Sequence, residues 1–453
     1  MKVFSDKLYQ QIIERMAEVW PVLRLIAEAS EQRGWSLYIV GGVVRDLLLE
    51  ERKSRPLTDI DLVVESEGEG IETTTVGAGV ILAEAIRADY ADIEAQVYGQ
   101  FQTAMLTWKS WQIDIATART EVYPYPAANP KVEPSNIRQD LYRRDFTINA
   151  IALKLTGSQP GQLLDLFDGR ADLKQRLVRV LHTNSFIDDP TRIFRAVRFA
   201  VRLGFELEPQ TEQLLRTALN SGVYAKSRSA HEKVPALQSR LQAELKYLLE
   251  ESGWEQSLVW LNSLGALTCL DDDVVITPEL LQQLRRMDRW VRKFGVDQPR
   301  WLLLLELILA QLDLDQRDRA ARFLNLSAPS QYRLHNLHTW EAQLKAQIGE
   351  QTRQLACPPS KVYESLRSHS RAELFLIANR HPRTLGVSIW LYLTRLTLIP
   401  PLINGATLKR LGYSPGPQFK EILADIYRRQ LDGTLTTEKA AEQYVLDRYS
   451  CSN

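Results

Sequence analysis

The sequence predicts an α+β fold in which a head with a small mixed sheet is followed by an all-helical remainder. Strand-like apolar runs, several of them separated by turn residues, occur at residues 37–40, 59–64, 93–98, 103–108 and 111–116. From Thr211 onward, apolar residues recur at helical spacing with few strand signals. With 453 residues, of which 45% are hydrophobic and 25% charged, the chain has room for two to four ordinary globular domains.

The charge balance argues against a uniformly basic nucleic-acid coat but leaves room for a local basic face. Lysine plus arginine equal aspartate plus glutamate at 56 each. Between Lys131 and Arg240, however, 18 basic residues stand against 12 acidic ones. The three cysteines, Cys269, Cys357 and Cys451, form neither a disulfide framework nor a zinc spacing, which fits a reducing cytoplasm.

No targeting signal and no membrane span are expected. Acidic residues such as Asp6 and Glu14 interrupt the N-terminal stretch, which therefore lacks the pattern of a signal peptide. The apolar run from Trp301 to Leu312 is too short to cross a bilayer and contains Glu306. We therefore expect a cytoplasmic protein.

A glycine pair after the first strand run suits phosphate binding. Gly41 and Gly42 follow residues 38–40, and a short helical pattern containing Arg45 comes next. Paired glycines let backbone amides approach a polyphosphate, and the positive end of a helix strengthens the attraction. Arg45 can add charge-assisted hydrogen bonds.

Two aspartates at the start of the next strand run suit metal binding. Residues two apart on a strand point to the same side, so Asp59 and Asp61 share one face while Ile60 turns into the core. Paired carboxylates beside a phosphate loop can hold a divalent metal. Alone, a glycine pair is usually a turn and such aspartates a solvated strand end. In this order they resemble the catalytic core of the nucleotidyltransferase superfamily typified by DNA polymerase beta, and neither a Walker loop nor a Rossmann fingerprint is present.

The segments that follow add further candidates. Asp114 is a third carboxylate, on a strand that could neighbour the first two; the alternative is a lone polar residue on a half-exposed strand. Residues 123–134 contain four prolines and are predicted to form a loop. Leu141–Leu153 is predicted as a helix, with Arg143 and Arg144 in its first turns and one of them directed at the cleft.

An arginine-rich helix is predicted after residue 190. Asp189 is the expected N-cap and Pro190 suits the first turn. Spacings of three, three and four place four arginines on one stripe. Such a stripe suits a polyanion, although the alternative is an exposed face paired with acids elsewhere. The arginines are Arg192, Arg195, Arg198 and Arg202.

These motifs together resemble the class II tRNA nucleotidyltransferase and poly(A) polymerase family, which includes the CCA-adding enzymes. The resemblance runs in order from Leu37 to Phe205 and continues more weakly through SRLQAELKYLLEE and the C-terminal LKRLGYSPGPQFKEILADIYRRQLDGTLTTEKA. Its motifs are GGVVRD, TDIDLVV, QIDIATAR, RRDFTINAIAL, LFDGRADLKQRLVRVL and DDPTRIFRAVRFAVRLGF.

The resemblance implies a division of the chain into four parts. An N-terminal helical segment at 1–36 would precede a polymerase-beta-like nucleotidyltransferase head at 37–155. A helical neck with a nucleotide pocket would occupy 156–275, and a helical body and tail that bind tRNA would occupy 276–453.

The resemblance also assigns roles to residues. It implies that Asp59 and Asp61 hold Mg²⁺, and that Gly42, Arg45 and Arg144 hold the triphosphate of CTP or ATP. It implies further that the neck lines the nucleotide pocket with Asp189, Arg192, Arg195 and Arg198. Two departures matter. Asp188-Asp189 replaces the family's frequent Glu-Asp, and the proline-rich loop at 120–137 leaves open whether CCA, only CC or only A is added.

The implied reaction is attack of an RNA 3′-hydroxyl on the α-phosphate of a nucleotide, with two metals and with Asp114 as a further ligand or proton acceptor. Asp189 accepts hydrogen bonds and Arg192 donates them, so the pair complements the exposed edges of cytosine and adenine. The alternatives are a poly(A) polymerase on general RNA, a catalytically silent RNA-binding relative, and a nucleotidyltransferase that modifies antibiotics or proteins.

Overall fold

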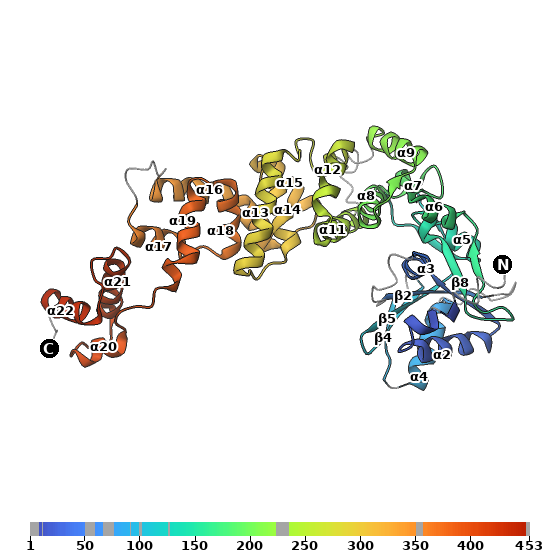
Figure 1. Ribbon diagram of the computed structural model, residues 1–453, viewed down its shortest axis with the longest axis horizontal. Helices are drawn as coiled ribbons and strands as arrows, with labels where there is room; N and C mark the ends of the chain where they lie inside the picture. The colour runs from blue at the N-terminus through green and yellow to red at the C-terminus, as the bar shows by residue number, and fades with distance from the viewer. Residues whose placement is uncertain are drawn as a thin grey trace. The chain divides into compact units, whose positions relative to one another are not determined.

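The structure is a computed structural model, and it describes residues 9–10, 12–49, 59–66, 77–90, 92–98, 102–125, 127–222, 235–349 and 357–449. The chain divides into two compact units, Met1–Cys269 and Leu270–Asn453. All strands of the described residues lie in the first unit, and the described part of the second is helical (Figure 1). The predicted α+β class is therefore confirmed.

The first unit is built on a seven-stranded mixed sheet. Its strand order is β3-β4-β5-β2-β1-β8-β9, and only the central β2–β5 pair is parallel. The strands are β1 (Trp35–Val40), β2 (Asp59–Ser66), β3 (Glu94–Tyr98), β4 (Thr103–Trp108), β5 (Trp111–Thr117), β8 (Ile151–Lys154) and β9 (Leu163–Asp165).

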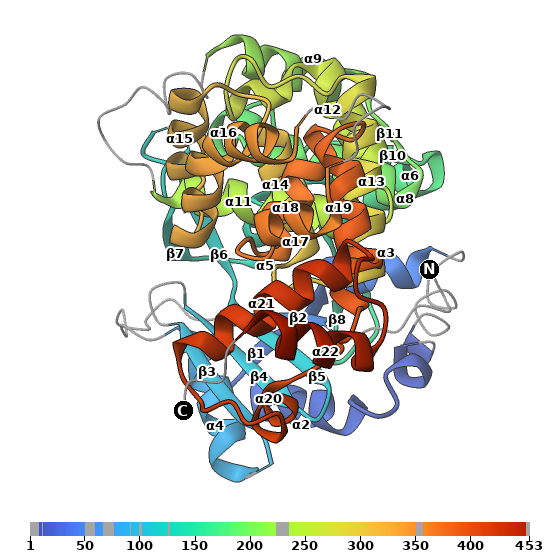
Figure 2. The same ribbon diagram turned by 90° about the vertical axis from the view of Figure 1, so that its left-hand side faces the viewer.

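Helices cover both faces of this sheet. On one face, α2 (Trp20–Glu31) and α4 (Ala78–Asp89) pack together (Figures 1 and 2). A Cβ on Gly79 would lie 2.9 Å from the carbonyl oxygen of Ile115, so α4 touches the backbone of β5. On the other face, α5 (Ile137–Tyr142) buries Ile137 and Leu141 against the sheet.

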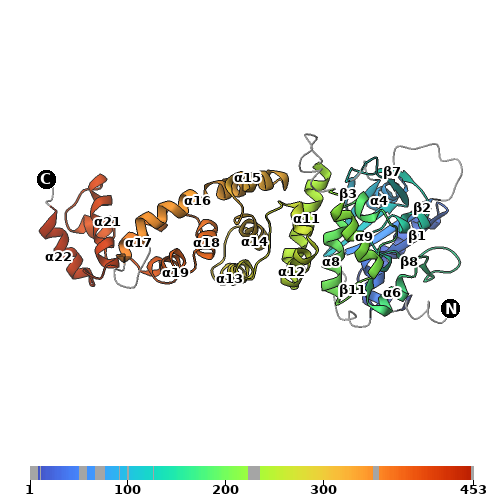
Figure 3. The same cartoon turned by 90° about the horizontal axis from the view of Figure 1, so that it is seen from above.

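The arginine-rich helix α8 (Arg192–Leu203) organises the rest of the first unit. It ends at Gly204, whose φ of 69° gives a left-handed cap. Helices α11 (Pro235–Glu250) and α12 (Trp254–Leu264) pack against it (Figure 3). The remaining elements are α3 (Gly42–Leu48), the hairpin β6 (Arg119–Val122) with β7 (Lys131–Pro134), η3 (Thr147–Asn149), α6 (Gly169–Gln175), α7 (Ser185–Asp188), α9 (Pro209–Asn220), η4 (Ala266–Cys269), and the parallel pair β10 (Leu177–Val178) and β11 (Glu206–Leu207).

The second unit consists of helices in its described residues. A buried ion pair joins Glu306 to Arg333 at 2.5 Å, and Thr437 caps the last helix as its sequence suggests. The helices are α13 (Pro278–Phe294), α14 (Arg300–Leu309), α15 (Leu314–Phe323), α16 (Ala328–Ile348), α17 (Pro359–Leu366), α18 (Arg371–Arg380), α19 (Leu385–Thr394), η5 (Leu396–Leu398), α20 (Gly405–Arg410), α21 (Pro417–Leu431) and α22 (Glu438–Arg448).

Two secondary-structure predictions are wrong. Leu141–Leu153 is not one helix, because α5 ends at Tyr142 and Ile151–Lys154 forms β8 beside β1. The Asp145 carboxylate accepts hydrogen bonds from the Phe146 amide and the Asn149 side chain, which turns the chain between the two elements. The predicted loop at 123–134 is partly a strand, since Lys131–Pro134 pairs with β6.

The four-part division of the chain stays a prediction. The sheet extends past the predicted head boundary at residue 155, because its edge strand β9 lies at Leu163–Asp165. The sequence also favours Ser5 as the N-cap of a first helix and Gly99-Gln100 as a turn between two strand runs; these residues lie outside the part of the chain that the structure describes. Among the described residues, no helix is long and apolar enough to cross a membrane.

Candidate active site

Three carboxylates meet at the parallel centre of the sheet. Asp61 on β2 lies in register with Asp114 on β5, so the two side chains share a face, and Asp59 is two residues earlier on the same face. Ile60 between them is buried, as the strand alternation predicts. The predicted neighbourhood of Asp114 and the Asp59/Asp61 strand is therefore confirmed.

Holding all three of these carboxylates ionised at once is electrostatically unfavourable. Burial, reinforced by Asp61 and Asp59, raises the pKa of Asp114 to about 6. Burial also raises the pKa of Asp61, and the charge of Arg144 offsets only part of that effect. The Asp61 side chain nevertheless stays open to the cavity beside it. Like charges held together in this way are stabilised by a cation placed between them.

The turn between β1 and α3 brings the backbone against these carboxylates. Gly41 has a φ of 73°, and a Cβ there would lie 3.1 Å from Asp61 Oδ2 and 3.3 Å from Arg144 Nη1. A residue with a side chain would therefore be strained and would press on both groups. Gly42 begins α3, and the sequence predicts both glycines as phosphate-binding residues.

Arg45 and Arg144 are held in place by side-chain contacts. Buried Arg45 donates from Nη1 to Asn149 Oδ1 at 2.7 Å and from Nε to Asp46 at 2.8 Å. Arg144 donates from Nη2 to the buried carboxylate of Asp140 at 3.0 Å. Both guanidinium groups are thus oriented before any ligand arrives.

One cavity of about 850 Å³ joins the sheet to the arginine-rich helix. Asp114 and Arg198 are not among the described residues that line it; Asp114 lines a smaller neighbouring cavity with Asp61 and Arg144. The predicted residues that line the large cavity are Gly41, Gly42, Arg45, Asp59, Asp61, Arg143, Arg144, Asp189, Arg192, Arg195 and Arg202.

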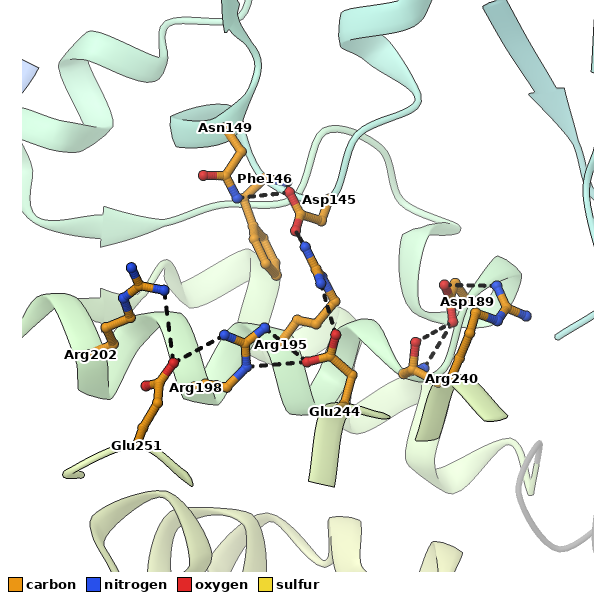
Figure 4. A network of polar contacts seen from close by, with 11 residues as sticks. Asp145, Phe146, Asn149, Asp189, Arg195, Arg198, Arg202, Arg240, Glu244 and Glu251 are labelled. Atoms are coloured by element: carbon orange, nitrogen blue, oxygen red, sulfur yellow. Dashed lines mark hydrogen bonds and ion pairs between the residues drawn. The ribbon is translucent and has the colours of Figure 1, made fainter. Parts of the chain in front are cut away.

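Three arginines of the α8 stripe, Arg195, Arg198 and Arg202, are paired with acids, as the alternative expectation has it (Figure 4). The stripe is not an exposed face, however, because Arg192 and Arg198 are buried. Arg195 donates to Asp145 Oδ2 at 2.7 Å and to Glu244 Oε1 at 2.8 Å. Arg198 donates to Glu244 Oε2 at 2.9 Å and to Glu251 at 3.1 Å. Burial opposes ionisation of Asp145, but Arg195 and its hydrogen bonds hold the pKa of that carboxyl at about 2.

Asp189 and Arg192 open onto the cavity from the start of α8. The regular helix begins at Arg192 with Thr191 before it, but Thr191 makes no side-chain capping bond, and Asp189 has the extended backbone typical of a cap. Asp189 Oδ1 accepts from the amide of Thr191 at 3.1 Å and from its hydroxyl at 2.7 Å. Arg192 donates to Ser185 Oγ at 2.7 Å and to the carbonyl of Arg143 at 2.8 Å.

Sequence reasoning missed several residues of this cavity. Asp145, Tyr123 and Glu121 line it, as do Arg240 and Glu244 on α11. In the sequence, Arg240 and Glu244 stand one helical turn apart, which by itself predicts only a pair on one helix face. Their spacing could have indicated this role. Glu244 can pair with arginines of α8, and Arg240 can pair with the acidic residue that precedes that helix.

Comparison with known proteins identifies the family. The protein-family model described as the poly(A) polymerase head domain matches residues 37–179. A solved structure of a CCA-adding enzyme in its apo form II is 31% identical, with a TM-score of 0.75, over 97% of this chain and 98% of that one. The Thermotoga maritima CCA-adding enzyme complexed with tRNA is 30% identical, with a TM-score of 0.73, over 97% and 98%. The chain belongs to the class II CCA-adding family.

Family relatives differ in name and in length. The A-adding tRNA nucleotidyltransferase of Geobacter sulfurreducens is 31% identical over 92% of this chain, but the chain spans only 45% of that protein. It spans 33% of the A-adding relative from Aquifex aeolicus. Other family members that match are named CC-adding and CCA-adding enzymes.

Proposed function

We propose that this protein adds all or part of the CCA sequence to the 3′ end of tRNA, using CTP, ATP or both and releasing pyrophosphate. The observation that carries the proposal is the single cavity lined by Asp59 and Asp61 on one side and by Asp189 and Arg192 on the other. The first pair suits phosphoryl chemistry, and the second pair suits recognition of a base. The family membership and the names of its relatives support the same reaction.

Asp59 and Asp61 are the proposed ligands of Mg²⁺. Their oxygens are hard acceptors, and the pKa of Asp61 is raised first by burial and then by the neighbouring charges of Asp59 and Asp140, which Arg144 offsets only in part. Two carboxylates, with phosphate and water oxygens completing the coordination, fit this assignment, because Asp114 is not among the described residues that line the large cavity. Bound magnesium would activate the attacking hydroxyl and neutralise the leaving pyrophosphate.

The chain's own residues position the triphosphate. The open backbone at Gly41 and Gly42 lets amide groups approach phosphate oxygens. Arg45 and Arg144 line the same cavity and supply charge-assisted hydrogen bonds. Both guanidinium groups are already anchored, so less side-chain freedom is lost when the ligand binds.

Asp189 and Arg192 are the proposed base-reading pair. A carboxylate only accepts and a guanidinium only donates, which matches the amino group and ring nitrogen of cytosine and adenine. Uracil and guanine would leave desolvated groups unpaired, at about 1–3 kcal/mol for each mismatch. Arg195 also lines the cavity, whereas the contacts of Arg198 with Glu244 and Glu251 favour a supporting role for it.

The second unit is proposed to bind tRNA through its backbone. Lys409, Arg410, Arg428 and Arg429 lie at its C-terminal end, and acids accompany the arginines, as in the pair of Arg428 with Glu364. Phosphate contacts release counterions, so tRNA affinity should fall steeply with salt. A chain ending at Leu398 should lose tRNA affinity much more than ATP affinity; equal tRNA affinity would refute the role of the tail. With tRNA as substrate, the expected location is the cytoplasm.

The decisive experiment measures incorporation of each radiolabelled nucleotide, supplied separately and as a mixture of CTP and ATP, into tRNA that lacks its 3′ CCA and into tRNA that ends in CC. We expect incorporation of C, of A, or of both in order, and little extension of an unrelated RNA of equal length. The nucleotides incorporated identify which part of CCA this protein adds. Equal extension of the unrelated RNA would instead favour a poly(A) polymerase, and no incorporation at all would favour a silent RNA-binding relative.

A further inference from the structure

One guanidinium group joins three separate elements at the edge of the large cavity. Arg240, on α11, donates from Nη1 to Asp189 Oδ2 at 3.0 Å (Figure 4). From Nη2 it donates to the carbonyl oxygen of Ala127 at 3.0 Å and to that of Ala128 at 3.2 Å. The same side chain therefore contacts the carboxylate assigned to base reading and the connection between β6 and β7.

The contacted part of that connection is firmly packed. Ala127 and Ala128 are buried, with exposed fractions of 0% and 1%. Ala127 has a φ of 65°, which is unusual for a residue with a side chain, and its amide donates to the carbonyl of Asp188 at 3.1 Å. The next two residues, Asn129 and Pro130, line the cavity. A shift of this backbone would therefore reshape the wall that a bound nucleotide meets.

The hydrogen bonds of Asp189 show why its partner matters. A carboxylate offers about four lone-pair positions. Thr191 occupies two of them on Oδ1, and Arg240 occupies one on Oδ2. The remaining position on Oδ2 can accept one N–H from an exocyclic amino group. Without Arg240, the carboxylate would be held at one oxygen only and would present a less defined acceptor.

We propose that Arg240 is a specificity-positioning residue, which fixes the Asp189 carboxylate and the Ala127–Ala128 backbone in one geometry so that the cavity selects cytosine and adenine over uracil and guanine. This inference rests on the proposed function. Arg240 acts through the groups that it holds, and the planar fork of a guanidinium suits it to bridge a carboxylate and two carbonyls.

The test compares wild-type protein, Arg240→Gln and the control Lys246→Gln. Lys246 is exposed on the same helix, so its replacement removes one positive charge without reaching the cavity. Dissociation constants for CTP, ATP, UTP and GTP are measured by equilibrium dialysis without tRNA. The readouts are the UTP-to-CTP and GTP-to-ATP ratios, which an inactive fraction of protein cannot change. Hydrogen exchange of the peptide spanning residues 123–130 is followed in parallel.

Loss of a charge-assisted hydrogen bond at Asp189 should lower at least one of these ratios about tenfold in Arg240→Gln. Amides of residues 127 and 128 should also exchange faster, and Lys246→Gln should behave as wild type. Ratios within twofold of wild type in Arg240→Gln would overturn the inference, as would a wild-type protein that binds all four nucleotides equally. Selective binding by a wild-type protein that extends no tRNA would instead refute the proposed function alone.

Discussion

The two walls of the large cavity differ in how far their charges are compensated by neighbouring groups. The carboxylate wall, formed by Asp59 and Asp61 with Asp114 behind them, gathers like charges, and burial raises the pKa of Asp61 and of Asp114. On the arginine wall, formed by α8 and α11, acids and bases alternate: Arg195 bridges Asp145 and Glu244.

This difference distinguishes residues whose charge suits binding of a ligand from residues whose ion pairs stabilise the structure. Uncompensated charge costs stability, so its presence on the carboxylate wall indicates a site shaped for cations rather than for folding. A compensated network keeps its geometry without a ligand, as the arginine wall does. Four experiments break or sharpen this contrast, and the largest effect is expected on the carboxylate wall.

Asp61→Asn should lower nucleotide incorporation by at least about a thousandfold, because it removes charge from the proposed metal site, where a metal contributes several kcal/mol. The fold should remain intact by circular dichroism, since the change is nearly isosteric. Asp89→Asn, at an exposed position on α4, makes the same chemical change away from the cavity and should leave incorporation unchanged. Near-normal turnover of Asp61→Asn at saturating magnesium would disprove the assignment.

Arg195→Met should destabilise the first unit by about 3 kcal/mol, because it leaves two buried carboxylates, Asp145 and Glu244, without their shared partner. The matched control is Arg216→Met, which breaks a more exposed pair with Glu212 and should cost less than about 0.5 kcal/mol. Urea unfolding followed by tryptophan fluorescence compares the two. Equal losses would show that the arginine wall contributes no special stability.

Acid should weaken the same wall through Asp145. Its folded-state pKa of about 2 lies below the ordinary 3.8, so its stabilising effect is present above about pH 4 and is lost as the pH falls toward 2. The full effect is about 2 kcal/mol, of which roughly half is lost by about pH 3. The urea midpoint of wild type should therefore fall more between pH 6 and pH 3 than that of Asp145→Asn; parallel falls in both proteins would contradict this origin.

Gly41→Ala should lower nucleotide incorporation about tenfold, since a side chain there presses on Asp61 and on Arg144. Gly34→Ala is the matched control: its φ of 71° imposes the same backbone strain, but nothing lies within 4 Å of the added Cβ. Both variants should lose about 1 kcal/mol of stability, and only the first should lose activity. If the two variants lose activity equally, strain alone explains the requirement for glycine.

The carboxylate wall was more predictable from the sequence than the arginine wall. Strand alternation alone places Asp59 and Asp61 on one face, and the strand carrying Asp114 had few possible neighbours in a small sheet. Arg195 bridges Asp145, which lies 50 positions before it in the chain, and Glu244, which lies 49 positions after it. No local sequence pattern specifies such distant partners. The sequence therefore indicated an arginine stripe that suits a polyanion. In the folded chain, however, acidic side chains from distant segments neutralise most of these arginines.

Local ambiguity explains the incorrect helix at 141–153. Its apolar residues fit helical spacing, but a short apolar run such as Ile151–Leu153 also fits a strand. Pairing with Val40 and its neighbours on β1 decides between the two. The turn at Asp145 depends on side-chain contacts with Phe146 and Asn149, which composition does not reveal.

The division of the chain has an evolutionary consequence. Every described residue that lines the large cavity lies between Gly41 and Glu244, inside the unit Met1–Cys269. Substitutions that alter the choice of nucleotide can therefore accumulate there while the helical half from Leu270 onward changes for its own reasons. Recombination near this boundary would exchange one half without the other, and a chimaera with the helical half of a relative should inherit this chain's nucleotide preference.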